Sequence, residues 1–390
     1  MSDVLALGPD DRVLLLAPHP DDETLATGGL LQRARACGAA VHVVYATDGE
    51  NNPWAQRATE LRWRISEEDR QRWGARRRQE ALRALARLGV PAGAVEILGY
   101  PDQGLTSLLL DAAQTPVAKL AALMASYCPT LLVAPTLDDL HPDHSALAVL
   151  ARLALDRVEC RRPRVLDYVV HGLGHRPRER EGAPLASTIA LRLTSEERRR
   201  KRMAILAHRT QLRVHRRGLL AFAADTEWFG ATQRASARAD SHPLRLAHVE
   251  GHTLRLAIAQ KARPAAFGQT SLYLAVDRRW GPGKRFRVVL PRRSARVDVC
   301  DVASGLVVAQ GTFTSGASDG ILRMPAALLR GAAAAFLKLE RRFGFFDEAG
   351  WREIPLAAPV PRQPVMSWPQ IAATREPVPR PAGVSEGLRA

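Results

Sequence analysis

The chain has 390 residues, of which 46% are hydrophobic and 25% are charged. This length exceeds what one small hydrophobic core supports, and no apolar run is long enough to cross a bilayer, so the sequence predicts a globular protein of two domains. Four scattered cysteines without paired spacing, and a polar start that does not resemble a secretory signal, lead us to expect a cytoplasmic protein with reduced thiols.

The formal net charge of +16 comes almost entirely from arginine. A charge of this size can indicate a polyanionic partner, and a non-catalytic polyanion-binding protein is one alternative function. The arginines are dispersed, however, apart from runs at 76–78 and 198–202, and no aromatic residues alternate with them. We therefore expect nucleic acid not to be a partner.

Apolar and amphipathic segments alternate through the first half of the chain. Strands are predicted at 13–17, 41–46, 95–98, 131–134 and 166–170, with helices at about 24–37, 75–88, 115–127 and 144–156. This alternation predicts an α/β fold with a Rossmann-like, doubly wound, mostly parallel sheet that helices cover on both faces. In such sheets ligands bind at the carboxyl ends of the strands.

A polar stretch, 51–74, interrupts this alternation and contains Trp54, Trp63 and Trp73. One interpretation is a lid whose indole rings stack on a sugar. The other is an additional packed helix, which we favour for Trp63 and Trp73.

The second half of the chain has a different pattern of predicted elements. A charged helix is predicted from Thr194 to about Leu212, with a capping box formed by Thr194 and Glu197. Short strand-like runs separated by Gly, Pro and Ser then predict a smaller C-terminal antiparallel β domain; they lie at 272–276, 286–290, 296–302, 306–313 and 321–325. The predicted boundaries are 1–235 for the α/β domain, 236–358 for an accessory β-rich domain and 359–390 for a Pro-rich tail.

Two predicted strands end in clusters of histidine and aspartate. The first cluster contains His19, Asp21 and Asp22, and the second contains His141 and His144. Buried charge at these positions requires a cation, a partner or a reaction to justify its cost. Because both clusters fall at strand carboxyl ends, we expect them to form one metal centre of two histidines and one carboxylate, with a position left open for water.

Spacing alone does not say which histidine of the second pair binds the metal. The carboxylate of Asp21 remains available to deprotonate water, and the remaining histidine to donate to a developing oxyanion. A purely structural alternative also exists for each cluster. Asp22 and Glu23 would be favourable at a helix N-terminus, and residues 141–144 could form a capped turn.

These motifs resemble the PIG-L/LmbE-like N-acetylglucosaminyl deacetylases. The resemblance rests on Pro18–Glu23 and His141–His144, and it covers about residues 10 to 230. Weaker motifs follow in the same order along the chain: Thr47–Glu50, Arg77–Glu80, Leu98–Leu105, Lys201 and Ala207–Gln211.

The resemblance implies a single zinc ion bound by His19, Asp22 and His144. It also implies that Asp21 is the general base and that His141, as the imidazolium, stabilises the tetrahedral oxyanion. The reaction would be hydrolysis of the acetamide of an N-acetylamino sugar (GlcNAc-type), whose partner is a small molecule or a glycoconjugate.

Three further residues are candidates for contact with the substrate, namely Arg78, Asp102 and Trp54. Asp102 could instead cap a turn, and Arg78 could be a solvated helix residue. A metal-dependent phosphoesterase, with arginines binding phosphate, is the alternative reaction.

Overall fold

The structure is a computed structural model of the chain. It describes residues 5–111, 113–172, 188–231, 242–259, 270–278, 282–340, 342–343 and 346–356. Met1–Leu356 form one compact unit, and the description below concerns that unit alone. The predicted Pro-rich tail, 359–390, lies outside the described residues.

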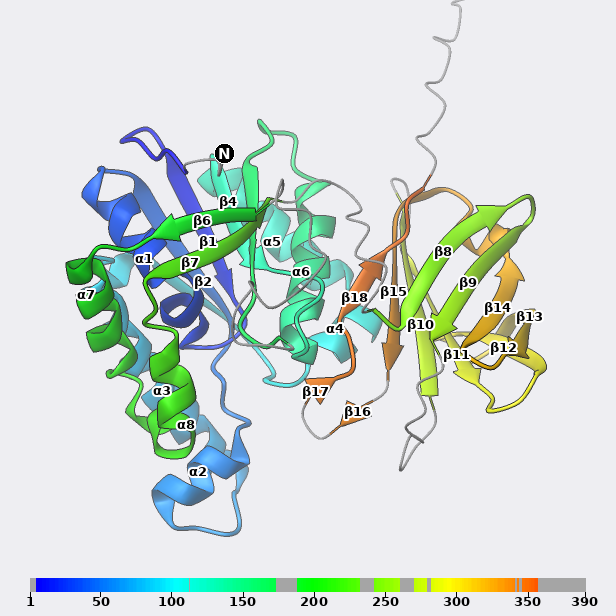
Figure 1. The fold of residues 1–390 in the computed structure, drawn as a ribbon, viewed down its shortest axis with the longest axis horizontal. Coiled ribbons are helices and arrows are strands. Elements are labelled where there is room, and N and C mark those ends of the chain that lie inside the picture. Colours follow the sequence, from blue (N-terminus) through cyan, green and yellow to red (C-terminus); the bar gives the residue numbers. More distant parts are fainter. Residues whose placement is uncertain are drawn as a thin grey trace, which may run out of the picture. The chain divides into compact units, whose positions relative to one another are not determined.

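The first sheet contains seven described strands in the order β3-β2-β1-β4-β5-β7-β6 (Figure 1). Their bounds are β1 Arg12–Ala17, β2 Ala40–Thr47, β3 Val95–Tyr100, β4 Leu131–Pro135, β5 Arg164–Tyr168, β6 Thr188–Arg192 and β7 Thr226–Ala231. Strands β1 to β5 pair in parallel, whereas β7 is antiparallel to both β5 and β6. The predicted α/β class and the five predicted strands are confirmed; β6 and β7 were not predicted.

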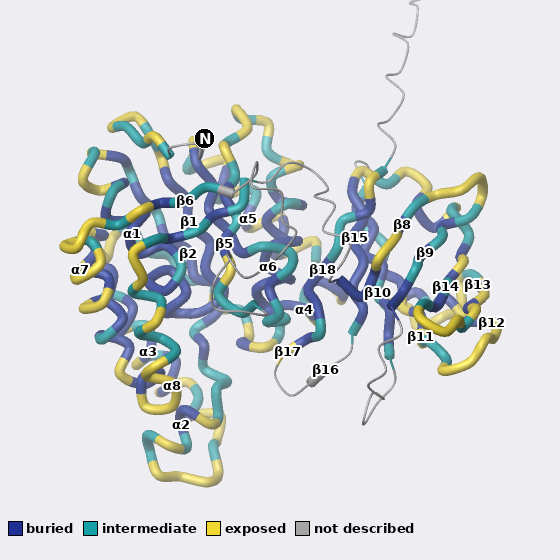
Figure 2. The backbone as a smooth tube through the Cα atoms, in the orientation of Figure 1, coloured by how far each residue is buried: buried dark blue, intermediate teal, exposed yellow. Residues whose placement is uncertain are grey.

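Helices cover both faces of this sheet because its inner strands are apolar on both sides. The described helices are α1 Asp22–Ala36, α2 Pro53–Glu60, α3 Glu67–Arg87, α4 Leu105–Asp111, α5 Gln114–Tyr127, α6 Pro142–Leu155, α7 Ser195–Ile205 and α8 Arg209–Ala221. Val13 and Leu15 of β1 point into a core with α1, α3 and α7. Leu14 and Leu16 point into a second core with α4, α5 and α6. Figure 2 shows these inner strands buried.

Two predicted helices have different bounds in the structure. Helix α3 begins eight residues before the predicted start at 75, because Ser66 and Asp69 form a capping box there. The predicted helix 194–212 keeps its capping box at Thr194, but it divides into α7 and α8 around residues 206–208.

The tryptophans of the polar stretch have different environments. Trp73 is fully buried on α3, as the packed-helix interpretation predicts. Trp63 is 76% exposed, so that interpretation is wrong for it.

The second sheet contains nine described strands in the order β18-β15-β10-β11-β12-β13-β14-β9-β8, and neighbouring strands in it pair in the antiparallel direction. Their bounds are β8 Leu244–Glu250, β9 Thr253–Ala259, β10 Thr270–Arg278, β11 Lys284–Leu290, β12 Ala295–Asp301, β13 Val307–Ser315, β14 Asp319–Pro325, β15 Ala332–Glu340 and β18 Trp351–Glu353. A short pair, β16 Arg342–Phe343 and β17 Phe346–Asp347, lies between β15 and β18 along the chain. The predicted C-terminal antiparallel sheet is confirmed.

The second sheet packs on the helices of the first. Phe336 and Trp351 belong to the same hydrophobic cluster as Leu109 of α4. The guanidinium of Arg285 donates a hydrogen bond to the carbonyl oxygen of Leu109 at 3.0 Å. Through α4 the two sheets therefore share a hydrophobic cluster and a polar contact, while the other face of the second sheet has a cluster of its own.

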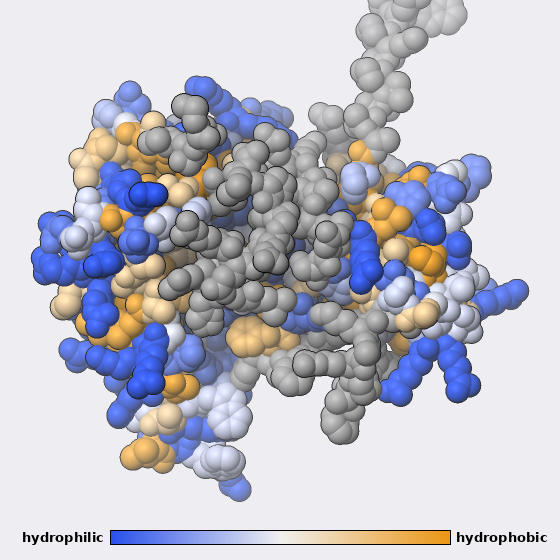
Figure 3. Space-filling model, viewed as in Figure 1, coloured by the Kyte–Doolittle hydropathy of each residue, from blue (hydrophilic) through white to orange (hydrophobic). Residues whose placement is uncertain are grey.

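Hydrophilic side chains are spread over the face drawn in Figure 3, both over the first sheet's helices and over the second sheet, with apolar side chains between them. Among the described helices, none is by itself long and apolar enough to cross a membrane. The bent pair α4 and α5 reaches that length and composition only when the two helices are joined across an angle of 105°.

Candidate metal centre

The two predicted clusters meet at one edge of the first sheet. Strand β1 lies in register beside both β2 and β4, so the carboxyl ends of these parallel strands share an edge. His19 follows β1 by two residues, and His141 is the N-cap residue of α6 after β4. The ring centroids of His19 and His141 are 4.7 Å apart, and those of His19 and His144 are 5.3 Å apart.

One oxygen of Asp22 lies between two imidazoles. Its Oδ2 atom is 3.3 Å from Nδ1 of His19 and 3.2 Å from Nε2 of His144. The potential ligand atoms of His19, His141 and His144 also lie within 4.8 Å of one another. Two imidazoles and a carboxylate that converge on one point in this way suit a divalent cation.

His144 has the environment of a metal-ligating histidine. Among the described residues neither of its ring nitrogens has an aligned hydrogen-bond partner, although carboxylate oxygens of Asp22 and Asp139 lie 3.2 Å from Nε2 and Nδ1. A carboxylate beside the second ring nitrogen fixes the orientation of a ligating imidazole. Burial lowers the pKa of His144, but these two carboxylates outweigh it and raise the pKa to about 10. A cation bound there would replace a proton, as metal binding to histidine generally does.

Asp139 also organises the loop around it. Its Oδ1 atom accepts the backbone N–H of His141 at 3.0 Å, and its Oδ2 atom accepts those of Val170 and His171 at 3.0 and 3.1 Å. Asp139 is completely buried. The residue therefore ties the segment after β5 to the loop before α6, which ends at His141.

His19 is held on its other side by two carboxylates. Its Nε2 atom lies 3.1 Å from Oδ1 of Asp102 and 3.4 Å from Oδ2 of Asp143. Asp102 in turn accepts the backbone N–H of Asn51 at 2.8 Å. With a proton on Nε2, His19 presents the lone pair of Nδ1 towards Asp22.

Asp21 lies beside this site in a strained backbone conformation, with φ of 152°. Its backbone N–H donates to Glu23 at 2.9 Å, and its Oδ2 atom is 3.2 Å from the guanidinium of Arg77. Burial raises the pKa of Asp21 to about 6, against the opposing charge of Arg77. A carboxyl group with such a pKa can exchange protons near neutral pH.

Arg77 is a buried residue of α3 that sequence analysis did not select. It donates hydrogen bonds to the carbonyl oxygens of Gly49 at 2.7 Å and Pro20 at 3.0 Å. Gly49 has φ of 63°, and a Cβ atom there would lie 1.9 Å from the Arg77 guanidinium, so the close approach requires glycine. Arg77 therefore joins the loops after β1 and β2.

His141 has a defined tautomer. Its Nδ1 atom accepts the backbone N–H of Asp143 at 3.2 Å, so a proton on the ring belongs to Nε2. Burial and the charges of His19 and His144 lower the pKa of His141 well below its usual value. Both observations favour neutral imidazole over the imidazolium that the resemblance implies.

A third strand end adds another histidine. His171 follows β5, its ring centroid lies 4.9 Å from that of His144, and its potential ligand atom lies within 4.8 Å of those of Asp22 and His144. Burial lowers the pKa of His171 to about 4. The strand predicted at 166–170 ends immediately before His171, so the criterion that selected the other clusters could have selected it too.

Two predicted substrate residues lie apart from these contacts. Arg78 forms an ion pair with Asp48 at 2.7 Å. Trp54 lies on α2, 54% exposed, with the Arg57 guanidinium 5.3 Å from its ring. These contacts direct both side chains to neighbours other than the histidine cluster.

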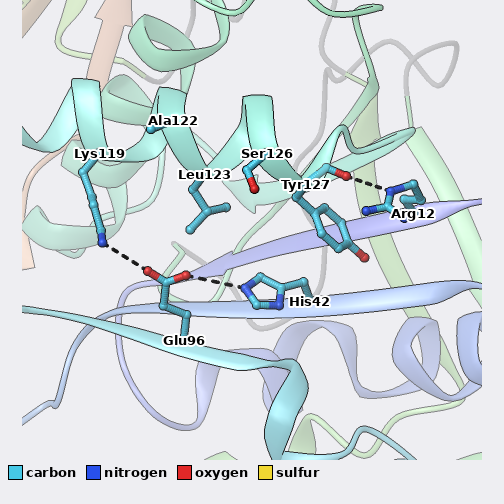
Figure 4. Close-up of a pocket in the computed structure, with 8 residues that line it drawn as sticks. All are labelled: Arg12, His42, Glu96, Lys119, Ala122, Leu123, Ser126 and Tyr127. Atoms are coloured by element: carbon cyan, nitrogen blue, oxygen red, sulfur yellow. Dashed lines mark hydrogen bonds and ion pairs between the residues drawn. The ribbon is translucent and has the colours of Figure 1, made fainter.

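A separate hollow opens at the other edge of the sheet, near the starts of β1, β2 and β3 (Figure 4). Its lining residues are Arg12, His42, Glu96, Lys119, Ala122, Leu123, Ser126 and Tyr127. Glu96 pairs with both Lys119 and His42, at 3.4 and 3.7 Å. These charges neutralise one another, so the hollow has no reactive group comparable with the strand-end cluster.

The fold and the strand-end cluster define a candidate divalent-metal centre with a buried carboxyl group and a neutral histidine beside it. Residues 14–155 match the family model described as PIG-L: GlcNAc-PI de-N-acetylase. Residues 14–155 are thus similar to the PIG-L family.

Curated relatives and a solved structure resemble parts of the chain. A protein of Tsukamurella paurometabola named 1D-myo-inositol 2-acetamido-2-deoxy-alpha-D-glucopyranoside deacetylase is 34% identical over 173 residues, which are 37% of this chain and 55% of the relative. A protein of the same name from Gordonia bronchialis is 30% identical over 176 residues, which are 39% of this chain and 59% of the relative. The chain therefore spans about half the length of these relatives. The crystal structure of a conserved protein of Thermus thermophilus superposes with a TM-score of 0.42 and 25% identity, over 59% of this chain and 98% of the other.

Proposed function

We propose that this protein is a metal-dependent deacetylase that hydrolyses the acetamide of an N-acetylamino sugar of the GlcNAc type, releasing acetate and a free amine. The observation that carries the proposal is the position of the Asp22 carboxylate. It lies 3.2 to 3.3 Å from two histidines, one in the loop after β1 and one on α6, and next to the buried Asp21. The family of residues 14–155 and the names of the relatives support the choice of an amide on an amino sugar.

The cation would be a single zinc ion held by His19, Asp22 and His144. This donor set of two imidazoles and one carboxylate is typical of catalytic zinc, and Asp139 provides the carboxylate that such sites place behind a histidine. Bound there, zinc would act as a Lewis acid and lower the pKa of a water molecule towards about 7.

Asp21 would be the general base. Its carboxylate takes a proton from the attacking water as the new C–O bond forms, and returns that proton to the amide nitrogen as the C–N bond breaks. Arg77 positions this carboxylate from its other side. His141 would donate its Nε2–H to the oxygen on which negative charge develops, as a neutral donor whose orientation is fixed by Asp143.

Asp102, Arg78 and Trp54 would contact the sugar. Asp102 has the strongest support, because it is buried beside His19 at 3.1 Å. Arg78 and Trp54 are partly exposed, and their contribution would depend on substrate groups that extend from the buried centre.

The finer description of the architecture is also a proposal. The order β3-β2-β1-β4-β5 and the helices on both faces support a Rossmann-like, doubly wound core in residues 1–235. Residues 236–358 would be an accessory β-rich domain, and 359–390 a tail.

The test is acetate release from N-acetylglucosamine conjugates by zinc-loaded protein. Asp21→Asn should reduce turnover by roughly 100- to 10,000-fold while the bound metal stays at one equivalent, because the base is lost but the ligands remain. Asp10→Asn, on an exposed turn, is the matched control and should leave turnover unchanged. Normal turnover in Asp21→Asn would exclude Asp21 as the base, and no acetate from any conjugate would exclude the deacetylase itself.

A further inference from the structure

The segment from β17 to the start of β18 reaches the loop that precedes α6. The backbone N–H of Asp347 donates to the carbonyl oxygen of Leu140 at 2.9 Å, and that of Trp351 donates to the carbonyl oxygen of Leu137 at 2.9 Å. A Cβ atom on Gly350 would lie 1.8 Å from the Leu137 carbonyl oxygen, so the backbones approach more closely than any other residue permits. Residues 346–351 are therefore fixed to the loop that ends at His141.

The segment is also anchored to β15 of the nine-stranded sheet. The carboxylate of Asp347 forms an ion pair of 2.5 Å with Lys338 of β15, and both side chains are buried. Phe346, immediately before this anchor, is thereby held at a defined place beside the candidate metal centre.

Phe346 adds an aromatic face to the site. Its ring centroid lies 5.2 Å from that of His171 and 6.0 Å from that of His141. These separations are in the range of packed aromatic rings. Phe346 is nevertheless 42% exposed, so part of the ring remains open to solvent next to the proposed oxyanion donor.

An exposed aromatic ring on a rigid support is suited to bind an apolar surface. The π face of a ring is negative and attracts C–H bonds, and a pyranose presents a face of such bonds. Isolated exposed apolar residues are common and need no ligand. Phe346 is distinguished from them by its contacts with two histidines of the site.

We propose that Phe346, backed by His171, forms a wall of the substrate site and stacks on the apolar face of a sugar ring. The C-terminal sheet would then contribute directly to acceptor specificity. This inference rests on the proposed deacetylase function, and it concerns a side chain outside the matched family segment.

The experiment measures KM and kcat of the zinc-loaded full chain with N,N'-diacetylchitobiose, and the Kd of the same sugar by calorimetry. Phe346→Ala should raise KM and Kd about 3- to 10-fold, the range expected for loss of one aromatic stacking contact, with kcat and metal content unchanged. Phe346→Trp should stay within about twofold of the wild type, because it keeps an aromatic face. Leu306→Ala removes an exposed apolar side chain elsewhere in the C-terminal part of the chain and should have no effect.

The outcomes separate this inference from the proposed function. Unchanged KM and Kd in Phe346→Ala, with turnover still lost in Asp21→Asn, would refute the stacking role of Phe346. The proposed deacetylase function would remain. A wild type that binds the sugar but releases acetate from neither it nor any other N-acetylglucosamine conjugate, and that loses binding in Phe346→Ala, would keep the stacking contact and overturn the function. A wild type that neither binds nor cleaves this sugar or any other N-acetylglucosamine conjugate would overturn both.

Discussion

At the residue scale, the buried carboxylates of this edge have distinct tasks. Asp22 faces two imidazoles, whose charges lower its pKa well below the usual value in spite of burial. Burial raises the pKa of Asp21, and the single guanidinium of Arg77 only partly offsets this rise. Neighbouring carboxyl groups whose pKa values are driven apart are typical of sites that need one permanent anion and one proton acceptor.

The position of Asp139 behind His144 leads to a prediction about metal affinity. Asp139→Asn keeps the size of the side chain but removes the negative charge beside Nδ1 of His144, and it should weaken zinc binding about 10- to 100-fold. Competition with a chromogenic chelator measures the affinity. Asp138→Asn changes the adjacent carboxylate and should bind zinc like the wild type; equal affinities in the two variants would show that Asp139 does not orient the ligand.

The sequence identified those site residues that stand at predicted strand ends. Strand polarity predicted that the loop with His19 and Asp22 lies beside the segment with His141 and His144. The choice of His144 as the ligand came from the family resemblance. Arg77 could not be distinguished from Arg78 in a run of arginines, since the choice depends on which face of α3 is buried. Phe346 was beyond prediction, because its place in the site depends on packing between two sheets.

At the scale of elements, α1 is clamped by a buried ion pair. Nζ of Lys201 on α7 lies 2.7 Å from Oε1 of Glu227 on β7, and both side chains are nearly inaccessible. The Glu227 carboxylate also accepts the backbone N–H groups of Gly29 and Leu30 in α1, at 2.6 and 2.9 Å. A Cβ atom on Gly29 would lie 2.2 Å from Leu193, so this close approach depends on glycine. The clamp holds the helix that begins at Asp22.

Removing one member of this buried ion pair should destabilise the folded protein. Lys201→Met leaves the Glu227 carboxylate buried without a countercharge and should lower the free energy of unfolding by about 3–5 kcal/mol, measured in urea. Lys119→Met removes an exposed lysine that pairs with Glu96 and should change it by less than about 1 kcal/mol. The double variant Lys201→Met/Glu227→Gln should recover part of the loss. Wild-type stability in Lys201→Met would mean that the pair does not support α1.

The elements that sequence analysis missed have recognisable causes. Residues 332–335 of β15 are four consecutive alanines, which favour a helix, and only pairing with β10 makes them part of a strand. Strand β7 joins the first sheet in the antiparallel direction, which interrupts the strand–helix alternation that predicted β1 to β5.

At the scale of the whole unit, the two sheets share one of their hydrophobic clusters, although each also has a cluster of its own. Trp351 is fully buried, and its ring belongs to the cluster formed by α4, α5 and α6 although β18 is part of the second sheet. Its backbone N–H also donates to the carbonyl oxygen of Leu137, in the loop between β4 and α6. Composition alone indicated two domains, but shared burial couples the candidate metal centre to the C-terminal sheet.

This coupling predicts a single unfolding transition. Trp351→Ala should lower the free energy of unfolding by about 3–5 kcal/mol, because it empties a large buried site. Since both sheets border that site, far-UV circular dichroism and tryptophan fluorescence should agree on one urea midpoint in the wild type, and again on one lower midpoint in the variant. Zinc affinity should fall as well, because the loop from Leu137 to His141 loses its support. Val307→Ala, on the exposed side of β13, is the control and should be neutral. Two separate midpoints, with zinc binding retained after the first, would show instead that the second sheet unfolds independently and that the metal centre stands without it.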